Sequence, residues 1–208
     1  MIKYVVFDVD GTLNQTDLYA VEAYQKALEK RGRKVTREEI ISCIGMSPMS
    51  IVERLFGSLE QEELEEWRTD IREYEFALMK EKSGTFEGIK TVLEKLKEEG
   101  FNLAICSNAF REHIWMVLNA IGVWEYFDEF GSLEMGNDKS EILGSLIQKL
   151  KPDCICMVGD RMYDIKAARK NQIPVIGCAY GYAPEEIKEA DIIVKTPHEI
   201  LSAVHKLL

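Results

Sequence analysis

Short, strongly apolar runs recur along this 208-residue chain, and segments of helical periodicity separate them. The first run, residues 2–7, is rich in β-branched and aromatic residues. Such runs are typical of strands that are buried on both faces, as in parallel sheets. Similar runs begin at Phe101, Cys154, Ile173 and Asp191. The alternation of strand and helix therefore predicts an α/β fold with a doubly wound parallel sheet.

Two of the helical segments have recognisable ends. The segment that starts at residue 88 stops at Gly100, which suits a C-terminal cap, and another begins with Pro184 at a first-turn position. We therefore expect a helix before Gly100 and a helix from Pro184. In doubly wound sheets the functional groups gather beyond the carboxyl ends of the strands, so the residues just after each apolar run are the candidates for a site.

The stretch between the first and second apolar runs carries only helical patterns. One helix is expected over residues 17–31, a second opens at Thr36, whose spacing to Glu39 matches a capping box, and a long charged helix covers residues 61–82. We interpret this insertion as a small helical cap that opens and closes over the active edge of the sheet. The expected division is a core of residues 1–14 and 85–208 and a cap of residues 15–84.

Charge and composition exclude several classes of protein. The net charge of -10 argues against binding to a nucleic-acid backbone, but local cations and a metal can still bind a small anion. The first apolar run is too short for a signal peptide or a membrane span, so we expect a cytoplasmic protein with no membrane partner. The five cysteines lack C-x-x-C spacing, which argues against disulfides or structural zinc.

Two acidic residues, Asp8 and Asp10, follow the first apolar run and precede Gly11 and Thr12. Residues two apart on a strand point the same way, and paired carboxylates repel each other unless a cation or a proton-transfer task compensates. Gly11 gives the backbone the freedom to turn sharply. Thr12 can offer a hydroxyl and an amide to a phosphate oxygen. The two acids thus favour either a cation site or a proton-transfer site, next to a group that can bind phosphate.

Polar residues follow two later runs in the same way. Ser107 and Asn108 place a hydroxyl and amide groups after the second run, where they can accept negative charge. Asp160 and Asp164 follow the run that begins at Cys154, and their spacing lets the second turn back toward the first as a helix begins. Lys139 opens another helical segment, and a fixed ammonium there could neutralise phosphate charge.

Taken together, these motifs resemble those of the haloacid dehalogenase superfamily: D-x-D-G-T-L, a strand that ends in Ser-Asn, an isolated Lys, and G-D-R-x-x-D. The resemblance covers essentially the whole chain, including a cap between the first two motifs, and is closest to the phosphoglycolate phosphatase-like branch. It implies a Rossmann-like core with an inserted cap. It also implies a phosphatase that hydrolyses a small phosphorylated metabolite.

The resemblance implies a role for each matching residue. Asp8 would be the nucleophile that forms an aspartyl phosphate, and Asp10 the general acid and base, with its backbone carbonyl facing the metal. Asp8 and Asp160 would hold Mg²⁺ directly, whereas Asp164 would act through a metal-bound water or orient Lys139. The residues that would bind the transferring phosphoryl group are Thr12, Ser107, Asn108 and Lys139.

The chain departs from the family pattern at two positions, and several questions stay open. Gln15 stands where many relatives have an acid, and Ala109 where many have Lys. A phosphomutase of the same superfamily and a non-catalytic metabolite-binding module are alternatives. The substrate is open between phosphoglycolate, a sugar phosphate, a nucleotide and pyrophosphate, and the chain could be a monomer or a homodimer.

Four further charged or titratable residues, one of them within the last motif, are candidates for a site or for the surface. Arg54 and Arg72 on cap helices could select the leaving group, but helix arginines are usually solvated. Arg161 follows a ligand position, although a solvent contact or a salt bridge is expected there. His113 has no metal-ligand spacing and is expected at the surface.

Overall fold

The computed structural model describes residues 1–208 and contains one six-stranded sheet in the order β3-β2-β1-β4-β5-β6, with every pair parallel. Its strands are β1 (Lys3–Phe7), β2 (Asn102–Cys106), β3 (Glu129–Gly131), β4 (Cys154–Gly159), β5 (Val175–Cys178) and β6 (Ile192–Val194). Chain order reverses on the two sides of β1, and ligands bind beyond the strand ends at such a switch point. The predicted doubly wound fold is confirmed.

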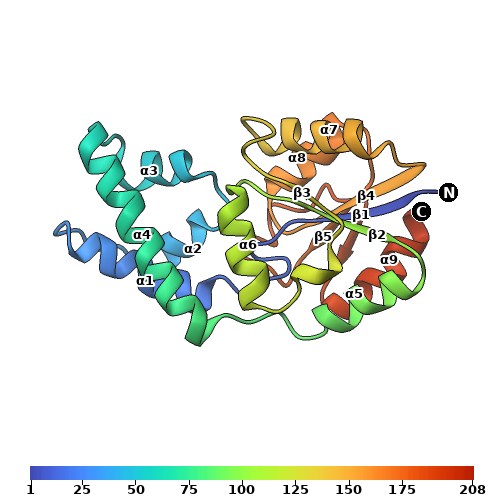
Figure 1. Ribbon diagram of the computed structural model, residues 1–208, viewed down its shortest axis with the longest axis horizontal. Coiled ribbons are helices and arrows are strands. Elements are labelled where there is room, and N and C mark those ends of the chain that lie inside the picture. The colour runs from blue at the N-terminus through green and yellow to red at the C-terminus, as the bar shows by residue number, and fades with distance from the viewer.

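Alternate residues of β1 enter two separate apolar layers. Val5 and Phe7 pack with Ile89, whereas Val6 packs with Leu143, so both faces of the strand are covered. Figure 1 shows the helices on the two faces of the sheet. On one face lie α5 (Ile89–Glu98), α6 (Arg111–Ala120) and α9 (Ile200–Leu207), and on the other lie α7 (Lys139–Leu150) and α8 (Met162–Lys170). The chain also contains two short 3₁₀ helices, η1 (Trp124–Tyr126) and η2 (Pro197–Glu199).

Four helices form the insertion between β1 and α5, and Figure 1 shows them at the end of the molecule away from both termini. They are α1 (Asp17–Glu29), α2 (Arg37–Cys43), α3 (Pro48–Phe56) and α4 (Gln61–Lys82). Leu28, Val52 and Trp67 form a small apolar cluster between them. Thr36 caps the N-terminus of α2 with the expected capping box.

The two segments that join the insertion to the sheet run side by side. The backbone N–H of Gln15 donates to the carbonyl of Gly84 at 2.9 Å, and Asn14 forms an isolated bridge with Thr85. Because these two connecting segments are hydrogen-bonded to each other, the insertion is attached to the sheet at one narrow place. The division into a core of residues 1–14 and 85–208 and a cap of residues 15–84 stays a prediction.

The structure differs from the sequence-based expectations in two segments. The residues from Pro184 to Ala190 form turns, with hydrogen bonds between residues three apart, and not the expected helix. Glu186 in these turns instead accepts hydrogen bonds from Arg161 and from the backbone of Met162. Strand β3 was not expected, because three residues at the sheet edge give no clear periodicity. No helix has the length and apolar character needed to cross a membrane.

Candidate active site

Three carboxylates meet at the carboxyl ends of β1 and β4. Asp8 follows β1, and Asp160 and Asp164 follow β4, the latter on the first turn of α8. One oxygen from each lies within 4.8 Å of the other two, and all three side chains are buried. Buried carboxylates at such separations repel strongly, so the cluster requires a compensating cation.

Lys139 supplies one compensating charge from the first residue of α7. Its Nζ lies 2.7 Å from Asp8 Oδ1 and 2.8 Å from Asp164 Oδ1, and the residue is only 3% exposed. Burial alone would lower the pKa of Lys139, but the two carboxylates outweigh burial and raise it, which keeps the ammonium charged. Burial raises the pKa of Asp8, and Lys139 opposes that shift.

Asp160 is held by groups from two loops. The Thr12 hydroxyl donates to its Oδ1 at 3.2 Å, and the Tyr182 backbone N–H donates to its Oδ2 at 2.9 Å. Burial, with Asp164 adding to it, raises the pKa of Asp160 to about 7. Gly11 lies against this carboxylate with φ +84°, where a Cβ would be 2.3 Å from Asp160 Oδ2. Only glycine therefore fits at this turn of the motif.

The donor set of the cluster fits a hard divalent cation such as Mg²⁺. Asp8 Oδ2 is buried and has no hydrogen-bond partner, although its Oδ1 faces Lys139. Such an orphaned carboxylate oxygen is costly unless a cation or a donor completes it. Three carboxylates beside one ammonium leave excess negative charge, and oxygen ligands are those that Mg²⁺ prefers.

Asp10 stands apart from the three carboxylates. Its Oδ1 accepts a hydrogen bond from the Thr16 hydroxyl at 2.7 Å. The Asn14 side-chain amide in turn donates to Thr16 at 2.9 Å and to the Tyr19 hydroxyl at 3.0 Å. This short network fixes the Asp10 carboxyl, and neither Thr16 nor Asn14 was singled out from the sequence.

Ser107 and Asn108 lie at the carboxyl end of β2, as expected, and both are buried. The Asn108 side-chain amide donates to the carbonyl of Gly45 in the cap at 3.1 Å. No backbone carbonyl accepts a hydrogen bond from the Asn108 N–H, which leaves that donor free at the sheet edge. The structure thus brings Ser107 and Asn108 to the same edge as Asp8.

A cavity of about 320 Å³ separates this edge from the insertion. Asp10, Ser107, Asn108 and residues of α6 line its core side, and residues of the insertion line the rest. A small ligand in the cavity would therefore contact both the sheet edge and the helices. Pockets of this size, with polar groups at one end, are the usual form of small-molecule sites.

Comparison with known proteins decides the family. The family model described as Haloacid dehalogenase-like hydrolase matches residues 5–178. The chain belongs to this family. Pyrophosphatase PpaX from Listeria welshimeri is 27% identical over 98% of this chain and 96% of the relative. The solved structure of a predicted phosphatase from Clostridium acetobutylicum aligns with this chain over the full length of both, at 25% identity and a TM-score of 0.86.

A further solved structure has the same fold. The predicted phosphoglycolate phosphatase from Haemophilus somnus has a TM-score of 0.87 at 23% identity and covers 97% of each chain. The relatives with phosphatase names support a phosphatase enzyme of the haloacid dehalogenase-like family. The expected family and fold are therefore confirmed.

In this haloacid dehalogenase-like hydrolase, Arg161 is buried and does not face solvent. Its guanidinium is buried, with Nε 2.9 Å from Glu186 Oε2, and it donates to the carbonyls of Ser42 and Ile44 in the cap. Arg161 therefore joins the loop after β4 to the insertion. A salt bridge was one of the two sequence-based expectations for Arg161, whereas its hydrogen bonds to the cap were not expected.

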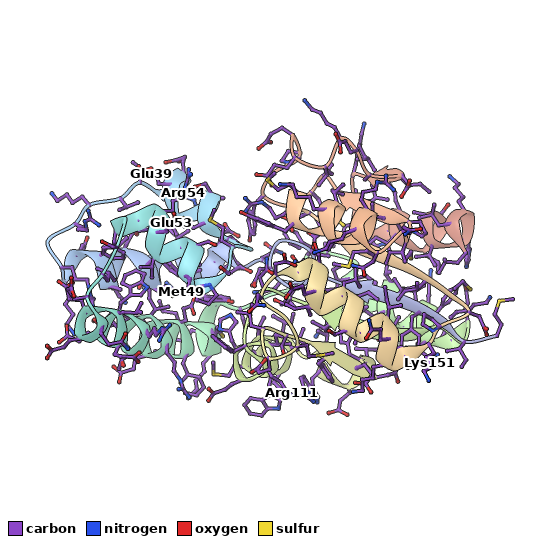
Figure 2. All side chains as sticks on the ribbon, turned by 90° about the horizontal axis from the view of Figure 1, so that it is seen from above. Glu39, Met49, Glu53, Arg54, Arg111 and Lys151 are labelled. Carbon is purple, nitrogen blue, oxygen red and sulfur yellow. The ribbon has the colours of Figure 1, made fainter.

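The two cap arginines lie in different surroundings. Arg54 is exposed and lies near Glu39 and Glu53 at the surface of the cap, as Figure 2 shows, and it does not line the main cavity. Arg72 does line the cavity, where it pairs with Glu112 of α6. His113, expected at the surface, also lines the cavity.

Proposed function

We propose that the protein is a Mg²⁺-dependent phosphatase that hydrolyses a small phosphomonoester through an aspartyl phosphate on Asp8. One observation carries the proposal: Asp8 is buried beside Lys139 with a second oxygen that no protein group satisfies. A carboxylate in this state can act as nucleophile toward phosphorus when Lys139 and a bound cation offset the negative charge of the substrate. The adjoining cavity provides room for the leaving group.

In the first step, an Asp8 oxygen attacks phosphorus in line and the bond between phosphorus and the leaving oxygen breaks. Asp10, in its protonated form, gives its proton to the leaving alkoxide. The hydrogen bond from Thr16 holds the Asp10 carboxyl at the cavity, where the leaving oxygen would lie. The products of this step are an alcohol and the aspartyl phosphate.

In the second step, water attacks the phosphorus of the aspartyl phosphate. Asp10, now a carboxylate, takes a proton from this water, the bond between phosphorus and Asp8 breaks, and inorganic phosphate leaves. Asp8 returns as a carboxylate beside Lys139, and Asp10 returns protonated. Water enters and phosphate leaves with both acids restored, so the cycle balances.

The remaining polar groups are proposed to bind the phosphoryl oxygens and the metal. Asp8, Asp160 and the Asp10 carbonyl would hold Mg²⁺, with Asp164 orienting Lys139 or acting through a metal-bound water. When bound, Mg²⁺ supplies positive charge against the phosphoryl oxygens. The groups proposed to stabilise the negative charge that develops on the phosphoryl oxygens are Thr12, Ser107, the Asn108 amide and Lys139.

The test is phosphate release from a panel of phosphorylated metabolites and para-nitrophenyl phosphate, with and without Mg²⁺, and with Asp8→Asn as the control. We expect Mg²⁺-dependent release that Asp8→Asn abolishes. Release by Asp8→Asn at the parent rate would contradict the proposed nucleophile. Phosphoryl transfer to a sugar without phosphate release would favour a mutase, and inertness toward every compound would favour a binding module.

A further inference from the structure

The cavity between cap and core is mostly apolar beyond the sheet edge. Of its 24 lining residues, 13 are hydrophobic. The cap contributes most of this lining, in particular Ile40, Ile44, Ile51, Val52, Trp67 and Ile71. Such a surface stabilises a leaving group in proportion to the apolar area that it removes from water.

One buried acid faces this apolar space. Glu75 of α4 is 8% exposed and lines the cavity with Asp10. The nearest basic side-chain atom is Nδ1 of His113, at 3.8 Å from Glu75 Oε2, which is too long for a hydrogen bond. Buried carboxylates are otherwise hydrogen-bonded or paired. Glu75 therefore has the capacity to accept a hydrogen bond from something in the cavity.

The two arginines that line the same cavity are exposed to solvent and already have partners. Arg68 is paired with Glu65, and Arg72 with Glu112. Their side chains are 45% and 61% exposed, unlike that of Glu75. A second anionic group on a ligand would thus meet Glu75 in the interior, and it would have to compete with glutamates for the arginines.

From this charge arrangement we infer the substrate class: a phosphomonoester whose leaving group is largely apolar, carries a protonated amine that pairs with Glu75, and bears no second anionic group. This inference rests on the proposed phosphatase function and specifies its leaving group. The amine would donate to the Glu75 carboxylate and add positive charge between Glu75 and Asp10. A carboxylate or second phosphate at that place would be repelled.

Binding of matched phosphonates tests the inference independently of turnover, because their carbon–phosphorus bond is not hydrolysed. The set comprises ω-aminoalkyl, n-alkyl and ω-carboxyalkyl phosphonates of increasing chain length, titrated by calorimetry into the Mg²⁺-containing protein. At the best length we expect the amine to bind about 10- to 100-fold more tightly than the carboxylate, the range of a charge-assisted hydrogen bond. Equal binding, or tighter binding of the carboxylate, would overturn the inference.

The matched variants are Glu75→Gln and Glu73→Gln, which remove the same charge from one helix. Glu73 is exposed, so its variant should keep the preference for the amine, whereas Glu75→Gln should lose most of it. An unchanged preference in Glu75→Gln would assign the discrimination to another residue and refute the proposal. Circular dichroism of both variants establishes that they are folded.

A parallel assay separates this inference from the proposed function. If the parent hydrolyses para-nitrophenyl phosphate but shows no amine preference, the phosphatase stands and the substrate class is wrong. If the parent shows the Glu75-dependent preference but hydrolyses no phosphate ester, the amine preference of the cavity is supported and the proposed phosphatase function is wrong. Loss of carboxylate binding in Arg72→Gln alone would show an anion site at the rim and count against the inference.

Discussion

The Lys139 ammonium lies 2.7 Å from the Asp8 carboxylate, and both side chains are buried. The same ammonium lies 2.8 Å from Asp164, so one cation from α7 offsets a carboxylate at the end of β1 and another on the first turn of α8. Its position ties the packing of α7 to the chemistry proposed at the end of β1. The stability of the fold and the activity should therefore depend on Lys139 together.

We predict that Lys139→Met lowers the free energy of unfolding by about 3–5 kcal/mol, because it leaves buried carboxylates without a counter-charge. Urea unfolding monitored by circular dichroism measures the change. The control is Lys151→Met, because Lys151 is exposed at the far end of α7 and far from the cap in Figure 2. Equal, small losses in both variants would contradict a structural role of the buried ion pairs.

The hydrogen bond from Thr16 to Asp10 predicts an effect on rate more than on binding. Thr16→Val removes the hydroxyl, and a misplaced general acid should lower kcat by about 10- to 100-fold with a smaller change in KM. Thr16→Ser keeps the donor and should restore most of the activity. A Thr16→Ser variant as slow as Thr16→Val would show that packing of the methyl group matters, not the hydrogen bond.

Arg161 is expected to couple the core to the cap. Arg161→Met removes its contacts with Glu186 and with the carbonyl of Ile44, and should cost about 1.5–3 kcal/mol of unfolding free energy and raise KM, because Ile44 lines the cavity. Thermal or urea unfolding and steady-state kinetics measure the two effects. Arg169→Met, which breaks an exposed pair with Asp191, should cost at most about 1 kcal/mol and leave KM unchanged.

Glu75 gives a prediction for the pH dependence of stability. Burial raises the pKa of Glu75 from 4.5 to about 7, with His113 opposing the shift and Asp10 adding to it; the hydroxyls of Tyr19 and Tyr24 titrate at higher pH. The folded protein thus binds the proton more tightly than the unfolded chain. The resulting stabilisation is complete below about pH 4.5 and is lost as the pH rises through about 7.

Relative to Glu75→Gln, the parent should therefore lose on the order of 3 kcal/mol of unfolding free energy at most between those pH values. Denaturant unfolding of both proteins across this range measures the difference, and the Gln side chain provides a reference that does not titrate. A difference that stays constant, or that grows in favour of the parent as the pH rises, would contradict a raised pKa.

The parts of the site that the sequence predicted are those that local motifs specify. Asp8 and Asp160 end buried strands, and parallel strands bring their carboxyl ends to one edge, so the spacing in the chain was sufficient. Lys139 was predicted from its motif and the start of a helix, and the structure places its ammonium between Asp8 and Asp164. The catalytic roles of these residues stay proposals.

The features that the sequence did not predict depend on long-range packing. Glu75 is one of many acids on α4, and only the packing of that helix against α1 and α6 decides which of them is buried. Arg161 required knowledge of where the cap carbonyls lie. The segment from Pro184 has a helix-like start, but its Glu186 is held by Arg161 within a series of turns.

The most direct test of the account is to trap the covalent intermediate. The enzyme is mixed with substrate and Mg²⁺, quenched in acid during turnover, and treated with borohydride, which reduces an aspartyl phosphate to homoserine. Peptide mass spectrometry then locates the modified residue. The account predicts homoserine at position 8 of the parent and none in Asp8→Asn. Turnover without any modification at position 8, or modification at Asp10 or Asp160 instead, would contradict it.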